Sequence, residues 1–247
     1  MTLTSLFSEQ EWALLSGALR LKPAQQCDPR SLPARALLDE TTCERLLQAL
    51  GPVIGSPTLA ITASLLAKRF SFLSTGACLY AMSVYDKGLR LSLDNCRVEY
   101  GHDDGVWTSS MPLDELQPFD YPPGQREAWR ASIVGSLFAG TLQPLWQTFY
   151  RVSGISRRIL WENTAVRVYS LYEKRMAKVE DPQVRQRCEA DFHWLLNDAE
   201  PALFGLDFFA DRRRSLKAKA RAFAFGAPAA STTRRATRSS TAPPVPC

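Results

Sequence analysis

The sequence predicts an α+β fold that is predominantly α-helical with a small antiparallel β insert. Apolar residues recur at helical spacing through most of the 247 residues, and several of these stretches follow a side chain that commonly caps helices. Alternation of apolar and polar residues, which is typical of strands, is confined to residues 89–109. These observations predict one small β element within a helical protein.

Two capping boxes predict helix starts in the N-terminal quarter. Ser8 with Glu11 precedes one apolar-periodic stretch, and Thr41 with Glu44 precedes a second. In such a box each of the two side chains satisfies a backbone N–H that the first helical turn leaves unpaired. Gly51 is expected to end the second helix.

A long apolar helix is expected after Pro57. Residues 59–85 are apolar on every helical face over about seven turns, so the helix is expected to cross the core. A serine-rich stretch at residues 71–76 predicts a break that divides this helix in two.

The β insert follows directly. Leu89, Leu91 and Leu93 alternate with polar residues, which predicts one or two half-buried strands. Turn-forming residues at 101–105 lead to a second strand over residues 106–109.

Three further helices are expected in the C-terminal half. Residues 126–152 form one periodic stretch, which Pro144 is expected to kink and Gly154 to end. A second helical stretch covers residues 159–179, and Asp181 is expected to cap the last helix.

The charge is distributed unevenly along the chain. Residues 212–247 hold nine Lys or Arg and no acid; removing these nine leaves 21 basic against 25 acidic residues, a net charge of −4 for residues 1–211. Residues 1–211 therefore lack the excess of positive charge that is typical of nucleic-acid-binding proteins. The Ala-, Pro-, Ser-, Thr- and Arg-rich composition of residues 227–247 predicts that residues 207–247 are a basic, low-complexity tail, either disordered or translated out of frame.

The N-terminal residues, the lengths of the apolar runs and the spacing of the cysteines predict a cytoplasmic protein. No apolar run reaches the roughly 20 residues that span a bilayer, and Glu9 and Glu11 precede the first basic residue, Arg20. The six cysteines are far apart, without the spacing of a zinc site or a disulfide framework.

Residues 155–165, Ile-Ser-Arg-Arg-Ile-Leu-Trp-Glu-Asn-Thr-Ala, carry a family resemblance. Together with the two helices that follow and the Glu-Pro-Ala-Leu-Phe segment at 200–204, they resemble the C-terminal half of FhuF-type ferric-siderophore reductases. The same region is similar to the C-terminal part of aerobactin-type siderophore synthetases. The resemblance implies a reductase domain over residues 1–206, with a helix and β insert at 57–110 and a helical part at 123–206.

The resemblance implies a role in bacterial iron acquisition: one-electron reduction of siderophore-bound iron(III), which releases iron(II). It implies a ferric siderophore as substrate, a 2Fe-2S cluster, an unidentified electron donor, and peripheral contact with the inner membrane or a siderophore transporter. The candidate substrate-binding residues are Trp161, Asn163, Arg157, Arg158 and Arg167. Trp161 also fits a core position, and Asn163 also fits a helix cap.

The cluster ligands that the family carries are missing from this sequence. The family motif is two adjacent cysteines, about ten residues, and then Cys-x-x-Cys, which together supply the four thiolates of a 2Fe-2S cluster. Near the C-terminus this chain has only Cys247. The chain as written is therefore expected to bind no cluster and to be inactive as a reductase.

A shift of reading frame accounts for the missing motif. Alanine codons begin GC and valine codons GT, so reading one base earlier gives a cysteine codon wherever the preceding codon ends in T. Ala229, Ala230, Ala242 and Val245 would then become Cys-Cys and Cys-x-x-Cys. The alternative is a genuine basic tail on a cluster-free module that binds siderophores or is associated with siderophore biosynthesis.

The nucleotide sequence that encodes residues 205–247 tests the frameshift. We expect the frame one base earlier to encode cysteine at positions 229, 230, 242 and 245 in an independent clone. If thymine is absent from the required third codon positions, the tail is genuine.

Overall fold

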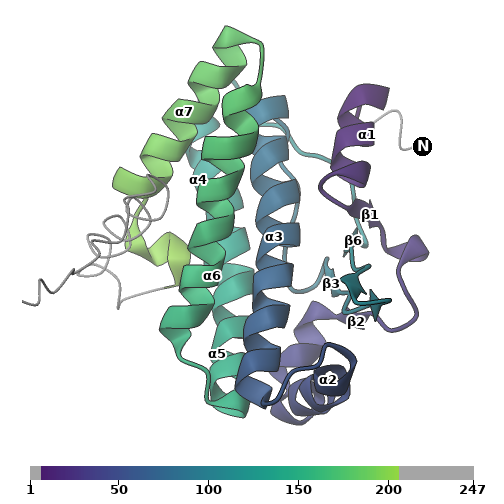
Figure 1. Ribbon diagram of the computed structural model, residues 1–247. Coiled ribbons are helices and arrows are strands. Elements are labelled where there is room, and N and C mark those ends of the chain that lie inside the picture. Colours follow the sequence, from purple (N-terminus) through teal and green to yellow (C-terminus); the bar gives the residue numbers. More distant parts are fainter. Residues whose placement is uncertain (1–6, 206–247) are drawn as a thin grey trace, which may run out of the picture.

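The computed structural model of the chain describes residues 7–205, and a single long helix, α3 (Leu59–Tyr85), lies at the centre of this part. Figure 1 shows α6 along one side of α3, and α1 with the short strands along the other. Thr58 caps α3 by accepting a hydrogen bond from the Ile61 N–H, and Asp86 ends it in the left-handed conformation. The prediction of an apolar helix that crosses the core is confirmed.

The predicted break of this helix at residues 71–76 is wrong, because α3 is continuous. The serine-rich stretch is compatible with helix since its hydroxyls bond to carbonyls of the preceding turn. Ser74 Oγ donates to Phe70 O at 2.8 Å, and Thr75 Oγ1 donates to Ser71 O at 2.6 Å. Small side chains also let neighbouring elements approach: a Cβ on Gly76 would lie 3.3 Å from Leu19 Cδ2.

The N-terminal helices follow the capping signals in part. Helix α1 (Glu9–Gly17) begins at the predicted box: Ser8 N–H donates to Glu11 Oε2 at 2.7 Å, and Glu11 N–H donates to Ser8 Oγ at 3.2 Å. Helix α2 (Glu40–Val53) begins earlier than predicted, because Asp39 is the cap and accepts from Thr42 N–H at 2.8 Å.

The expected stop of α2 at Gly51 is also wrong. The helix continues to Val53, and Gly51 is buried within it. A Cβ at this position would lie 3.3 Å from Thr62 Oγ1 of α3, so the glycine permits close helix packing.

The strands are shorter than predicted, and three of them, β1, β2 and β6, lie outside the predicted segments. The described residues contain three two-stranded pairs: β1 (Leu21–Pro23) parallel with β6 (Met111–Leu113), β2 (Leu32–Pro33) antiparallel with β3 (Arg97–Val98), and β4 (His102–Asp103) antiparallel with β5 (Val106–Trp107). The last pair confirms the predicted turn and second strand, although the strand ends at Trp107 rather than at residue 109.

The leucine alternation at residues 89–93 is not a strand. Leu89, Leu91 and Leu93 are buried, but they lie in an irregular segment where Leu91 N–H donates to Leu89 O at 3.0 Å. Asn95 holds this segment through side-chain bonds to the Arg90 and Glu115 carbonyls. The three leucines alternate with polar residues because they are buried in a loop. Such a loop has the same apolar–polar pattern in its sequence as a half-buried strand.

The predicted helix over residues 126–152 is divided. Helix α4 (Arg126–Leu137) leads through a π-helical turn, η4 (Phe138–Leu142), into α5 (Gln143–Ser153). The irregular turn lies next to Pro144, which has no N–H to give to the preceding turn. Gly154, at φ +70°, ends α5 as predicted.

The C-terminal helices pack beside α3 and α4. Helix α6 (Arg157–Ser170) continues through the π turn η5 (Leu171–Arg175) and the 3-10 turn η6 (Met176–Lys178), and α7 (Pro182–Asn197) follows. The predicted cap at Asp181 is confirmed, since its carboxylate accepts from Gln183 and Val184 N–H. The shorter turns are η2 (Ala24–Gln26), η3 (Ala34–Leu38) and η7 (Pro201–Phe204).

A buried ion network attaches α7 to α4. The Asp191 carboxylate, whose side chain is fully buried, accepts two hydrogen bonds of 2.8 Å from Arg126 and one of 2.9 Å from Arg130. Arg126 also pairs with Asp86 at 2.9 Å, at the C-terminal end of α3. Such charge-assisted, bidentate bonds define the position of α7.

These elements account for the expected fold class, which is α+β and mainly helical. Within residues 7–205, none of the helices combines the length and the hydropathy needed to cross a membrane.

One buried hydroxyl joins three helices. Thr164 Oγ1 of α6 donates to Leu160 O at 3.0 Å; it lies 2.9 Å from Ser71 Oγ of α3 and accepts from Trp146 Nε1 of α5 at 3.1 Å. The substitution Thr164→Val keeps the shape but leaves the indole N–H without an acceptor. We expect it to lower the free energy of unfolding by about 1–3 kcal/mol in urea denaturation.

Thr164→Ser is the matched control. It retains the hydroxyl and should cost no more than about 1 kcal/mol for the lost methyl group. Equal stability of the Val variant and the original chain would show that these bonds do not stabilise the helix junction.

Candidate functional site

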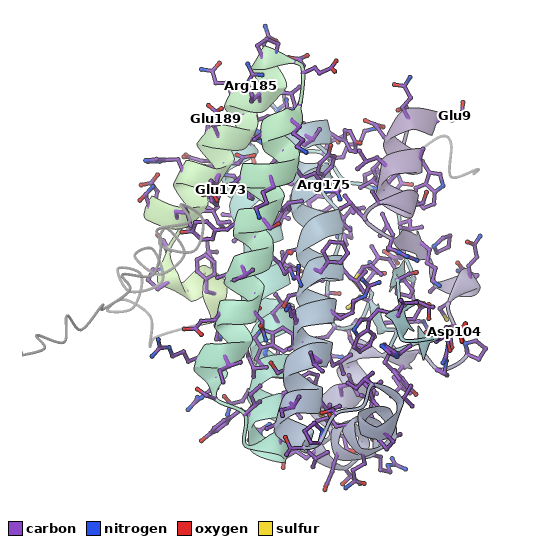
Figure 2. The ribbon with its side chains drawn as sticks, in the orientation of Figure 1. Glu9, Asp104, Glu173, Arg175, Arg185 and Glu189 are labelled. Atoms are coloured by element: carbon purple, nitrogen blue, oxygen red, sulfur yellow. The ribbon has the colours of Figure 1, made fainter. Side chains whose placement is uncertain are left out.

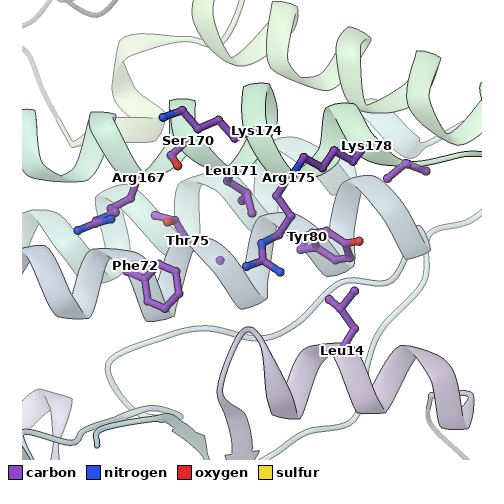
Figure 3. Close-up of a pocket in the computed structure, with 12 residues that line it drawn as sticks. Leu14, Phe72, Thr75, Tyr80, Arg167, Ser170, Leu171, Lys174, Arg175 and Lys178 are labelled. Atoms are coloured by element: carbon purple, nitrogen blue, oxygen red, sulfur yellow. The ribbon is translucent and has the colours of Figure 1, made fainter. Parts of the chain in front are cut away.

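A cavity of about 510 Å³ opens between α3, the C-terminal part of the α6–η5–η6 segment, and α1. Its size lies within the range of small-molecule sites in proteins. Apolar and aromatic groups form much of its wall: Leu14, Phe72, Gly76, Tyr80, Leu171 and Val179. Figure 3 shows the side chains of Leu14, Phe72 and Tyr80 at the space between the helices.

Four cationic side chains complete the lining: Arg167, Lys174, Arg175 and Lys178. They come from one helical segment, α6–η5–η6, and their spacing along it places them near the same side of that segment. No Asp or Glu lines the cavity, and within residues 7–205 none of the four cations makes an ion pair. We call this set of four side chains the basic cluster.

The two arginines of the basic cluster are half-buried, whereas the two lysines are exposed. Figure 2 places Arg175 on the side of its helix that faces α3, and Glu173 on the side that faces α7. The opposite charges in this segment are thereby separated onto two faces. Of the charged side chains in this segment, only the positively charged ones line the cavity.

Arg167 has an unsatisfied donor. Its Nε is buried and has no hydrogen-bond partner among the described residues, and burial lowers the pKa of the guanidinium. The guanidinium carbon lies 5.8 Å from the ring centroid of Phe72. A buried donor without an acceptor is costly, so an anion in the cavity would offset an existing penalty.

The positive potential extends beyond the cavity edge. Arg69 lies 5.5 Å from the Phe72 ring centroid, and its pKa is lowered to about 10 by burial first and then by Arg20 and Arg167. Glu99 acts in the opposite direction, but this carboxylate already pairs with Lys22 at 2.6 Å. Mutual repulsion among the arginines therefore remains and favours an anionic ligand.

Arg167 is the only one of the five sequence-predicted site residues that lines this cavity. Arg157 lies 4.7 Å from the Tyr150 ring, and Arg158 pairs with Glu162 at 2.9 Å, both near the start of α6. The structure thus does not bring these two arginines together with Arg167 in the cavity.

The other two predicted residues lie in the helix interface. Trp161 is 8% exposed and packs against Phe138 with ring centroids 6.4 Å apart, as the core interpretation expects. Asn163 is not a helix cap, because α6 begins at Arg157 after its cap Ser156. Its amide instead donates to Ser64 Oγ of α3 at 3.1 Å.

Sequence reasoning missed Lys174, Arg175 and Lys178. The available signal was their spacing from Arg167, at seven, eight and eleven residues, which places them on one helical face. The sequence does not show which residues form the cavity wall opposite these cations. That wall comes from α1 and α3.

A second, smaller cavity of about 160 Å³ lies on the other side of the same helix, against α7. Its lining includes Tyr172, Met176, Cys188 and Phe192, and its charged lining residues Glu173, Arg185 and Glu189 are visible in Figure 2. Its cations and acids are mixed, so it has no uniform charge.

The described cysteines do not fit an iron–sulfur cluster. Within residues 7–205, no three Cys, His, Asp or Glu side chains are grouped so that they could hold a metal ion. Burial raises the pKa of Cys43, Cys78 and Cys96 to about 12 and that of Cys188 to about 11, which opposes the thiolate form that ligates iron. The proposed frame-shifted positions, 229, 230, 242 and 245, lie outside the described residues.

Comparison with known proteins identifies the family. The family described as ferric iron reductase FhuF-like transporter matches residues 64–208, which include most of α3, the strands β3 to β6 and all the helices from α4 to α7. No curated protein and no solved structure matches the chain. The match covers more than half of the 247 residues, and it contains all four members of the basic cluster. The chain therefore belongs to the FhuF-like ferric iron reductase family.

Proposed function

We propose that this protein binds a ferric siderophore in the cavity lined by the basic cluster, as part of iron acquisition. The observation that carries the proposal is the combination of an apolar wall with four cations that make no ion pair within residues 7–205. Family membership supports a ferric complex as the ligand. A chelated ferric ion with an organic shell matches a site of this size and character.

The electrostatics of the cavity favour the reduction that is expected of the family. Adding one electron to a ferric complex makes it more negative by one charge. The basic cluster stabilises that added charge, since half-buried cations interact with it more strongly than exposed ones do. The anionic oxygen donors of the siderophore then hold iron(II) less tightly than iron(III), and the metal leaves.

The source of the electron separates two versions of the proposal. The described residues contain no ligand set for a 2Fe-2S cluster. Beyond them the sequence has one cysteine, Cys247, so we propose that the chain as written binds the ferric complex without reducing it. The preferred version is a reductase whose cluster segment is lost or misread. The alternative is a cluster-free module of siderophore metabolism that uses a genuine basic tail to contact an acidic partner or a membrane surface.

Other parts of the proposal rest on the family resemblance. We place the protein in the cytoplasm, with peripheral contact to the inner membrane or a siderophore transporter and with an electron donor of unknown identity. Arg157, Arg158, Trp161 and Asn163 stay predicted contacts for a ligand or partner at the other end of α6.

Ligand binding is tested by removing a cation from the basic cluster. We expect Arg175→Ala to weaken ferric-siderophore binding about ten- to a hundredfold, because charge-assisted bonds contribute about 1.5–3 kcal/mol. Equilibrium dialysis with iron quantified by mass spectrometry measures the affinity. Lys174→Ala, at an exposed position, is the second variant.

Arg45→Ala is the matched control for this experiment. Arg45 lies on α2, outside the cavity, where it bonds to Thr42 Oγ1 at 3.3 Å. Unchanged affinity in both cavity variants, with helicity retained by circular dichroism, would place the siderophore elsewhere.

Cluster content is tested by anaerobic reconstitution with iron and sulfide. We expect the chain as written to remain colourless, since its described cysteines are not grouped into a ligand set and burial raises the pKa of four of them. A version encoded in the preceding frame from residue 205 onward should turn brown and hold about two irons per chain. A brown product from the chain as written would contradict the assignment and would require ligands from its existing cysteines.

A further inference from the structure

The basic cluster is a local feature that the overall charge does not explain. Residues 1–211 carry a net charge of −4, yet the cavity lining includes four cations and no acid. A random distribution of the surface charge would mix signs, as the smaller cavity beside α7 does. The separation therefore points to selection among ligands by charge.

The depth of the cations determines how strong that selection is. Lys174 and Lys178 lie exposed at the rim and are screened by water, whereas Arg167 and Arg175 are half-buried in the wall. Burial lowers the pKa of Arg167 and leaves its Nε without a partner among the described residues. A neutral ligand would desolvate these groups further without compensating their charge, whereas an anion would compensate it.

Ferric complexes differ in charge according to their donor groups. Three hydroxamates cancel the charge of a ferric ion and give a neutral complex. Ligands that bind through catecholates, or that keep free carboxylates, leave the complex negative, whereas a pendant amine leaves it positive. The charge of the complex is thus a property that the cavity can distinguish while the metal stays the same.

We propose that the cavity selects ferric complexes with a net negative charge, from carboxylate- or catecholate-bearing ligands, over neutral trihydroxamate complexes. This inference rests on the proposed function, because it assumes that the cavity is the siderophore site. It adds the chemical class of the ligand. It assigns Arg167 and Arg175 as the residues that determine specificity.

The test uses gallium(III) complexes, which have the charge and geometry of the ferric ones but are not reduced. Isothermal titration of the full chain compares four complexes: a citrate-based one with free carboxylates, a triscatecholate, a neutral cyclic trihydroxamate, and a trihydroxamate with a pendant ammonium. We expect either or both anionic complexes to bind at least about tenfold more tightly than the neutral one, with the cationic one weakest. The ratio should fall as salt is raised.

Variants of the basic cluster show whether it causes the difference in affinity between anionic and neutral complexes. Lys174→Gln/Arg175→Gln should weaken the binding of the anionic complexes by about tenfold or more and that of the neutral complex by less than about threefold. The matched control, Arg45→Gln/Arg151→Gln, removes the same charge from α2 and α5 and should leave both affinities unchanged. Arg175→Gln alone provides the same comparison if the double variant unfolds.

The outcomes separate this inference from the proposed function. Equal affinity for anionic and neutral complexes, or an equal loss of both in the folded double variant, overturns the selection by charge and leaves siderophore binding in place. Failure of all four complexes to bind overturns both. A preference for the carboxylate or the catecholate complex identifies which anionic class the cavity accepts.

Discussion

The structure depends on the burial of α3, because a helix that is enclosed along most of its length must find every polar partner inside the protein. Three polar contacts join it to α6 and η5: Ser64 with Asn163 at 3.1 Å, Ser71 with Thr164 at 2.9 Å, and Ser83 with Tyr172 at 2.9 Å. They recur along the length of α3, so they define both the register and the face of the partner helix. Ser71, one of the serines that suggested a break, is therefore among the residues that specify the packing.

The register has a direct consequence for the site. Once Asn163, Thr164 and Tyr172 face α3, the helical period places Arg167 and Arg175 at the edge of the same interface. The π turn at Leu171–Arg175 adjusts the direction of the last cations. Helix α1 supplies the opposite wall through Leu14, so the cavity needs three segments that are far apart in sequence.

Under the proposed function, the chain separates ligand binding from electron transfer. The apolar and cationic lining proposed for a ferric complex lies in the described helices, whereas the family resemblance implies cluster ligands in a C-terminal segment, at positions where this sequence has alanine and valine. A cavity of this kind would survive the loss of the cluster, since none of its lining residues is a cysteine. Binding without reduction is then the expected property of this sequence.

The sequence by itself determined the fold class, most of the helix positions, the family and the absence of the cysteine motif, because local periodicity, capping residues and the Ile-Leu-Trp-x-Asn signature are written in contiguous residues. It did not determine the continuity of α3 or the loop at residues 89–93, since burial by distant segments overrides local patterns there. Of the cavity it identified only Arg167. The rest was decided by tertiary structure, because a cavity exists only where separate helices leave space between their side chains.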